Sequence, residues 1–259
     1  MSSPSRRRQW RIGRDLGPAN HGRFCEAISR TGTVAVAKMA DASGEAAHSR
    51  ITNEIEVVAS LNERGLLDVI GVGEHRAALF YVTPMMTSTP PHADRDEIAR
   101  SVLHHVGATL MALHDMDVAH RDVRPHNIVW QSDMPRLVDY GLTQMLGPDS
   151  RTSGVGPLGS VAFMAPELLT GMPSDHRVDI WALGATLHVI ATGRGIYPGM
   201  SDDDVTSAIA TLATSQPEIA DGLAPDLGTA IRWCLDEPGR RCRDIANLLQ
   251  ATAKTGAIR

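Results

Sequence analysis

The spacing of apolar residues changes at TSTPP (87–91), and this change constrains the fold more than any other feature of the chain. Before it, from residue 10 to 82, glycine-punctuated segments and the apolar run ALFYV (78–82) are typical of short strands. One helical pattern interrupts these strands, formed by Ile51, Ile55, Val58 and Leu61 at spacings of four, three and three residues. The first third of the chain is therefore predicted to be rich in strands, with one helix.

After the proline-containing break, which is typical of a connector, the spacing is mainly helical. A long apolar stripe consists of Leu103, Val106, Leu110 and Leu113. Short strands are predicted at 128–130 and 136–138, a long mobile loop at the Gly/Ser/Pro-rich stretch 147–160, and helices at 179–192 and 243–252.

These patterns predict an α+β fold with two lobes. Residues 10–86 are expected to form a small strand-rich lobe with one key helix, and residues 87–259 a larger, mainly helical lobe. The polar, basic residues 1–9 are expected to form a disordered tail. A chain of 259 residues is long enough to bury a sizeable core.

Composition argues against several classes of protein. The net charge of −5 does not favour nucleic-acid binding, which usually needs a basic excess. Cys25, Cys234 and Cys242 form no CxxC pair, and the N-terminus has no apolar stretch typical of a signal peptide, so we expect a reduced, cytoplasmic setting. No uninterrupted apolar run is long enough to predict a membrane span.

Lysine is scarce in this chain. Among 25 lysine and arginine residues only Lys38 and Lys254 are lysine. Lys38 lies within VAVAKM (34–39), which has the pattern of a buried strand. A scarce lysine in such a run is a candidate functional residue.

Two polar motifs carry further candidates. HRDVRPHN (120–127) follows a predicted helix and precedes a short strand, and VDYG (138–141) places a second aspartate at a strand end. Asn127 and Asp139 would supply the oxygen ligands that suit Mg²⁺, and Asp122 would then be free to accept a proton from an attacking hydroxyl. Any one of these aspartates alone would more often be a turn or cap residue.

Taken together, the motifs resemble those of the eukaryotic-like Ser/Thr protein kinase family over residues 10–250. The matching segments, in the order of that family, are LGPANHGRF (16–24), VAVAK (34–38), HRDVRPHN (120–127), DYG (139–141), APE (165–167), DIWALG (179–184) and Glu237 to Arg241. Seven ordered matches are far more specific than a lone glycine-rich loop. The resemblance implies a bilobal protein-kinase-like fold and transfer of the γ-phosphoryl group of Mg-ATP to a protein Ser or Thr hydroxyl.

The resemblance also implies a role for each matching residue. Lys38 would bind the α- and β-phosphates, held by Glu54, which fits the family pattern better than Glu56. Asp122 would act as the base and Arg124 would touch the transferring phosphate, where Ser/Thr kinases normally have lysine. The metal ligands would be Asn127 and Asp139. The remaining ATP contacts would come from Leu16, Gly17, Ala19, Gly22, Phe24 and Val36.

Three further residues would be structural in such a fold. Glu167 and Arg241 would form an ion pair in the helical lobe, and Asp179 would brace the catalytic loop. Arg121 suggests control by phosphorylation of the activation segment, with Thr152 or Ser153 as the modified residue. Besides ATP and a protein substrate, a second copy of the chain that is phosphorylated in trans is a partner to expect.

Two alternatives remain open. The middle glycine of the glycine-rich loop is replaced by Ala19, and Phe24 and Val36 add bulk to one wall of the predicted nucleotide pocket. These departures would suit a pseudokinase that binds partners without catalysis. An enzyme that phosphorylates a small molecule is disfavoured by the APE and DIWALG segments, which the aminoglycoside-type kinases lack.

Overall fold

The computed structural model describes residues 10–19, 22–40, 45–90, 94–145, 161–170, 175–200, 204–237, 240–241 and 245–256. The described residues fall into two compact units. The first comprises the residues up to Thr87 together with Asp139–Leu142, and the second comprises Ser88–Val138 and the residues from Thr143 onward. The tail predicted at 1–9 and the loop predicted at 147–160 lie outside the described residues.

The first unit is built on an antiparallel sheet with one long helix. The strands have the order β1-β2-β3-β5-β4. Their bounds, with those of the helix and of a short 3₁₀ helix, are β1 (Trp10–Ala19), β2 (Gly22–Ser29), β3 (Val34–Ala40), α1 (Glu45–Glu63), β4 (Gly71–His75), β5 (Ala78–Thr83) and η3 (Tyr140–Leu142). The predicted strand-rich first third of the chain is confirmed.

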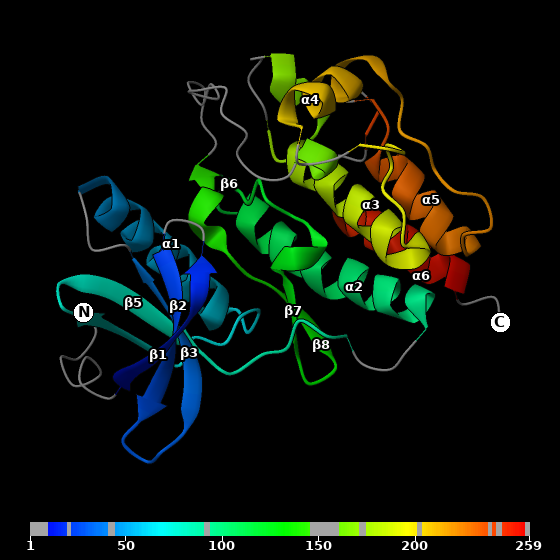
Figure 1. The fold of residues 1–259 in the computed structure, drawn as a ribbon. Coiled ribbons are helices and arrows are strands. Elements are labelled where there is room, and N and C mark those ends of the chain that lie inside the picture. The colour runs from blue at the N-terminus through cyan, green and yellow to red at the C-terminus, as the bar shows by residue number, and fades with distance from the viewer. Residues whose placement is uncertain are drawn as a thin grey trace. The chain divides into compact units, whose positions relative to one another are not determined.

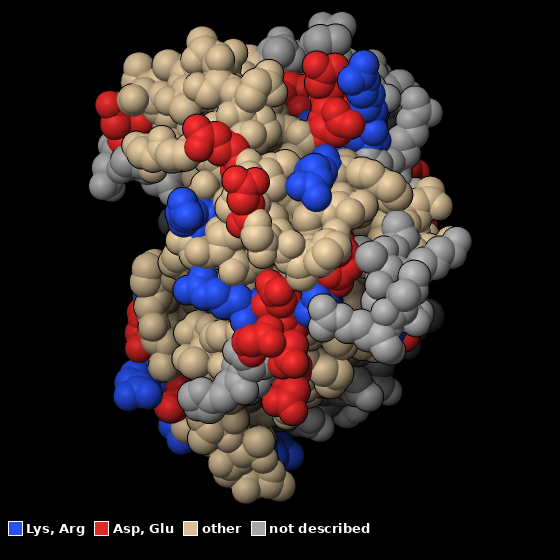
Figure 2. Space-filling model, turned by 90° about the vertical axis from the view of Figure 1, so that its right-hand side faces the viewer, with Lys and Arg blue, Asp and Glu red and all other residues tan. Residues whose placement is uncertain are grey.

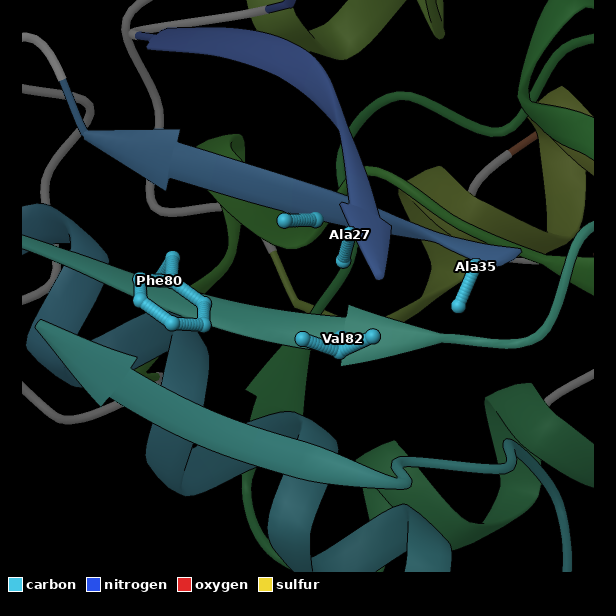
Figure 3. Close-up of a cluster of buried hydrophobic side chains, with 5 residues drawn as sticks. Ala27, Ala35, Phe80 and Val82 are labelled. Carbon is cyan, nitrogen blue, oxygen red and sulfur yellow. The ribbon is translucent and has the colours of Figure 1, made fainter. Parts of the chain in front are cut away.

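Side chains of one sheet face form a small hydrophobic core. Figure 3 shows Ala27 of β2, Ala35 of β3 and Phe80 and Val82 of β5 gathered together. The Phe80 ring lies so close to Gly73 of β4 that a Cβ there would be 2.5 Å from it. Because successive side chains of a strand point to opposite faces, Val36 and Lys38 lie on the other face of the sheet.

Helix α1 has the amphipathic pattern that its sequence predicts. Ile51, Val58 and Leu61 are buried, with at most 3% of each side chain exposed. Glu54 belongs to the same buried face, whereas Glu56 is exposed. The helix therefore presents one carboxylate to the protein interior.

The second unit is mainly helical (Figure 1). Helix α2 packs against α3, and both pack against α5, which contacts α6. The bounds are α2 (Arg95–His114), α3 (Arg177–Thr192), α4 (Val205–Thr214), α5 (Pro225–Cys234) and α6 (Ile245–Gly256). The predicted stripe from Leu103 to Leu113 is buried in α2, so this helix prediction is confirmed.

Short elements of the second unit carry the polar motifs. They are the two-stranded pairs β6 (Val118–Ala119) with β9 (Gln144–Met145) and β7 (Ile128–Gln131) with β8 (Met134–Leu137), and the 3₁₀ helices η2 (Pro125–Asn127), η4 (Val161–Phe163) and η5 (Pro166–Thr170). The strands predicted at 128–130 and 136–138 correspond to the β7–β8 hairpin. Together the two units confirm the predicted α+β class.

The ends of the long helices follow ordinary capping chemistry. The Asp94 carboxylate accepts a hydrogen bond from the Glu97 N–H and so begins α2. Helix α3 ends at Gly193, which has a left-handed φ of 74° that glycine adopts without a Cβ penalty. These caps fix where the two central helices of the second unit begin and end.

The surface carries charges of both signs. Figure 2 shows Lys and Arg side chains and Asp and Glu side chains on the same face. No helix in the described residues is both long enough and apolar enough to cross a bilayer. The absence of a nucleic-acid partner stays a prediction from composition.

Candidate active site

The first unit holds a buried network of ion pairs around Lys38. The Nζ of Lys38 lies 2.6 Å from Glu54 Oε1 and 2.7 Å from Asp139 Oδ1. Only 2% of Lys38, 3% of Glu54 and 8% of Asp139 is exposed. Three sequence motifs that are far apart in the chain therefore meet at one ammonium group.

Local structure explains how these side chains meet. Lys38 points out of β3 on the face opposite the alanine cluster, and Glu54 lies on the buried face of α1. Asp139 has a φ of 67°, a left-handed conformation that is uncommon for a residue other than glycine. Such strained backbone is found where the surrounding structure over-determines it, which is frequent at functional sites.

The second unit holds the loop that carries Asp122. Asn127 Nδ2 donates hydrogen bonds of 2.7 Å to both the carboxylate Oδ2 and the main-chain oxygen of Asp122. The Nε of Arg124 lies 3.3 Å from Asp122 Oδ1. Asp122 and Asn127 are each 5% exposed, so the buried Asn127 amide orients this carboxylate and the Arg124 guanidinium lies beside it.

Asp179 of α3 braces the same loop from behind. Its Oδ2 accepts a 2.8 Å hydrogen bond from the His120 N–H, and its Oδ1 accepts a 2.7 Å bond from the Arg121 N–H. His114 Nε2 lies 3.0 Å from Oδ2. Burial alone would raise the pKa of the Asp179 carboxyl, but these donors and the neighbouring histidine charges outweigh it and lower that pKa.

The glycine-rich segment forms the β1–β2 hairpin. Gly17 has a φ of +128°, which side chains rarely adopt, and its N–H donates to Asp15 Oδ1. Gly22 has a different requirement, because a Cβ there would lie 2.1 Å from the Met39 carbonyl oxygen of β3. Ala19 pairs with Gly22 in the hairpin, and Leu16 of β1 is 39% exposed.

The two bulky residues of the predicted nucleotide pocket share the face of Lys38. Phe24 of β2 is paired directly with Lys38 of β3, and Val36 precedes Lys38 by two residues. Both side chains are half-buried. Phe24 and Val36 therefore lie on the same sheet face as Lys38, and their place in the wall of a nucleotide pocket stays a prediction.

The predicted ion pair of the second unit is present. The Nη1 and Nη2 of Arg241 donate to the two carboxylate oxygens of Glu167. Arg241 is 1% exposed, its guanidinium lies 4.8 Å from the centre of the Trp181 ring, and Nη1 also donates to the Arg177 carbonyl oxygen. A buried arginine with this many acceptors ties η5 to α3.

Of the residues predicted to regulate activity, the structure describes Arg121. Arg121 has a φ of 67°, and burial lowers the pKa of its guanidinium although Asp179 opposes the shift. Thr152 and Ser153 lie outside the described residues.

The sequence missed some residues of the network. Tyr81 OH donates to Glu54 Oε1 over 2.9 Å, and the Tyr140 N–H donates to the same oxygen over 3.2 Å. A signal for Tyr81 was available, because a phenol within the apolar run at 78–82 needs a partner when it is buried. His114 of α2 likewise contacts Asp179, a contact that the sequence does not predict.

Asn127 of the second unit and Asp139 of the first each carry a side-chain oxygen of the kind that Mg²⁺ binds in proteins. Because Asn127 Nδ2 donates to Asp122, its amide oxygen Oδ1 is the atom left to bind a cation. Mg²⁺ is usually held by one or two protein oxygens together with substrate phosphates. No cluster of three His, Cys, Asp or Glu side chains suited to a metal occurs among the described residues.

Known proteins with related sequences and folds are kinases. Residues 10–250 match the family described as the protein kinase domain. The chain is 29% identical over 222 residues to the DNA damage-responsive serine/threonine-protein kinase RqkA of Deinococcus radiodurans, covering 78% of this chain and 32% of RqkA. It is 29% identical over 193 residues to the serine/threonine-protein kinase PknL of Mycobacterium tuberculosis, covering 68% of this chain and 47% of PknL.

A solved structure shows the same fold. The twitchin kinase region from C. elegans superposes with a TM-score of 0.78 at 21% identity, over 94% of this chain and 45% of that chain. This likeness confirms the protein-kinase fold that the motif order predicts. Both of the sequence relatives described above are serine/threonine-protein kinases. Because the family match covers residues 10–250, the chain belongs to the protein kinase family.

Proposed function

We propose that the protein is a Ser/Thr protein kinase that transfers the γ-phosphoryl group of Mg-ATP to a hydroxyl of a protein substrate. The observation that carries the proposal is the buried network in which Lys38 contacts both Glu54 and Asp139. Burying one ammonium group with two carboxylates is unfavourable unless the excess negative charge is compensated. A divalent metal ion that binds together with the nucleotide would supply that compensation.

Each candidate residue then has a chemical task. Lys38 binds phosphate oxygens while Glu54 holds its ammonium group in place. Asp139 and Asn127 are the proposed ligands of Mg²⁺, which neutralises phosphate charge when it is bound. Asp122 accepts the proton of the substrate hydroxyl, since its carboxylate is already oriented by the Asn127 amide.

Arg124 is proposed to neutralise charge on the transferring phosphoryl group. It stands where related kinases normally have lysine, and arginine keeps the positive charge although its planar fork differs in shape from an ammonium group. Its 3.3 Å contact with Asp122 places the cation beside the proposed base.

The test is transfer of phosphate, measured by intact mass after incubation with Mg-ATP and a generic basic protein. Wild-type protein should add 80 Da increments (about the mass of one phosphoryl group) to itself or to the substrate. Asp122→Asn should lower transfer by roughly 1000-fold while nucleotide still stabilises the fold, because the base acts only on the chemical step. Asp133→Asn, in the exposed β7–β8 turn, is the matched control and should be as active as wild type.

A pseudokinase is the second candidate, favoured by the position of Phe24 directly across from Lys38. It predicts no transfer by wild-type protein. A thermal shift on addition of Mg-ADP separates the cases further: stabilisation without transfer indicates a nucleotide-binding pseudokinase. Transfer to a free small alcohol but never to protein would instead indicate a small-molecule kinase.

We further propose that phosphorylation of Thr152 or Ser153 activates the enzyme, with Arg121 binding the phosphate. The support is the cation beside the proposed base together with the two hydroxyl residues between the DYG and APE motifs. Peptide mass spectrometry of active protein should find phosphate within residues 143–160. Active protein that carries no phosphate there would contradict this regulation.

A further inference from the structure

A buried hydroxyl contacts the same carboxylate oxygen that binds Lys38. The Tyr81 OH donates a 2.9 Å hydrogen bond to Glu54 Oε1, and Tyr81 is 5% exposed. The register of β3 with β5 places Tyr81 directly opposite Lys38. Side chains at directly paired positions leave the same face of a sheet, so both reach α1 from neighbouring strands.

Glu54 Oε1 is therefore shared by donors of different kinds. It receives the Lys38 ammonium at 2.6 Å, the Tyr81 hydroxyl at 2.9 Å and the Tyr140 N–H at 3.2 Å. The ammonium group also contacts Asp139. The pairing of β5 with β3 places the Tyr81 side chain on the sheet face from which its hydroxyl reaches Glu54. Within the described part of the chain, the Tyr81 hydroxyl donates to one carboxylate, whereas the Lys38 ammonium contacts two.

The charges in the network explain what this hydroxyl contributes. One ammonium group faces two carboxylates, and all three residues are at least nine-tenths buried. A neutral O–H donor stabilises the excess negative charge without adding an ion that must itself be desolvated. Burial, and then the Glu54 carboxylate, raise the pKa of the Tyr81 phenol well above its ordinary value, so the phenol stays a donor at physiological pH.

We propose that Tyr81 is a positioning residue for phosphoryl transfer, whose hydroxyl holds the Glu54 carboxylate so that Lys38 stays aligned for the nucleotide phosphates. This inference rests on the proposed kinase function. While Lys38 binds phosphate oxygens and shares its N–H donors with them, the Glu54 carboxylate keeps the Tyr81 hydroxyl and the Tyr140 N–H as donors. The side chain of Glu54, and with it α1, then needs no rearrangement during turnover.

The kinetic test compares two tyrosine-to-phenylalanine variants. Tyr81→Phe should lower kcat/KM for Mg-ATP about tenfold, a size expected when one hydrogen bond to a charged group is removed, and leave KM for the protein substrate unchanged. Tyr197→Phe is the matched control, because its buried hydroxyl has no hydrogen-bond partner among the described residues. That variant should behave as wild type, and equal losses in both variants would overturn the inference.

A second measurement does not depend on activity. The chain has only two lysines, so an amine-directed acylating reagent reports on Lys38 with Lys254 as the internal reference. In Tyr81→Phe, the loosened pair should let Lys38 react at least about three times faster relative to Lys254, whereas Tyr197→Phe should not change the ratio. In a Glu54→Gln background the Tyr81→Phe substitution should add little, since both act through the same oxygen.

The outcomes separate this inference from the proposed function. A wild-type protein that transfers no phosphate, with Lys38 labelling still raised in Tyr81→Phe, would overturn the kinase proposal and leave the alignment of Lys38 by Tyr81 standing. A wild-type protein that transfers phosphate, with labelling and kcat/KM unchanged in Tyr81→Phe, would overturn the inference alone.

Discussion

At the scale of single residues, the chemistry depends on the kind of cation at position 38. A lysine ammonium is compact enough to contact Glu54 at 2.6 Å and Asp139 at 2.7 Å within a site that is almost fully buried. A guanidinium is a wider planar fork, so it cannot occupy the same space between the two carboxylates. The chain uses arginine almost everywhere else, which makes the retained lysine informative.

Lys38→Arg should therefore lower kcat/KM by about 100-fold or more, equivalent to roughly 2.7 kcal/mol, although the charge is unchanged. Lys254→Arg makes the same chemical change elsewhere and should retain wild-type activity. The measurement is steady-state transfer from Mg-ATP to a basic protein substrate. Equal activity of the two variants would contradict the role assigned to Lys38.

At the scale of elements, helix α3 organises the second unit. Its Asp179 accepts hydrogen bonds from the main chain of the loop that carries Asp122, and Thr186, about two turns further along, donates to the Val123 carbonyl oxygen. Arg241 contacts the Arg177 carbonyl oxygen at the start of the same helix while it pairs with Glu167. One buried helix thus anchors both the loop with the proposed base and the APE segment.

Arg241→Met should test the second of these anchors. Removing one partner of a buried ion pair leaves the other charge uncompensated, and we expect the free energy of unfolding to fall by about 3–5 kcal/mol. Arg232→Met, on the exposed side of α5, is the control and should change stability by less than about 0.5 kcal/mol. Urea denaturation followed by circular dichroism measures both, and similar midpoints would show that the pair contributes little.

At the scale of the whole molecule, stability should depend on pH through His188. Its Nδ1 lies 2.9 Å from the Arg194 carbonyl oxygen, and its Nε2 accepts a 3.0 Å hydrogen bond from the Ala220 N–H. Protonation of Nε2 would remove that acceptor. Burial, with a smaller contribution from the Arg194 charge, lowers the pKa of His188 below its ordinary value of 6.5.

A lowered pKa in the folded state means that the unfolded chain binds the proton first as pH falls. The stabilisation should be fully present above pH 6.5 and should be lost as pH falls from there toward the folded-state pKa. The slope from one such group cannot exceed about 1.4 kcal/mol per pH unit. His188→Gln should flatten the wild-type dependence of the unfolding midpoint on pH between 7.5 and 5, and identical pH profiles would contradict this role.

Much of the fold and of the candidate site was predictable from the sequence. Apolar periodicity identified α1, α2 and the strands, because burying one face of an element imposes a repeat that can be read from the chain alone. The order of the polar motifs singled out Lys38, Asp122 and Asp139, since each motif combines a local backbone shape with a reactive side chain. Glu54 fits the family pattern better than Glu56, and the structure buries Glu54 while it leaves Glu56 exposed.

Only the tertiary structure decided which distant groups touch. The register of β3 with β5 brings Tyr81 opposite Lys38. The pairing of β2 with β3 requires glycine at position 22, because a Cβ there would collide with the Met39 carbonyl oxygen. Asp139 is part of the first compact unit, although the preceding residue, Val138, is part of the second. Periodicity records which face of an element is buried, but not which segment covers it, because that choice depends on shape and charge at contacts between residues far apart in the chain.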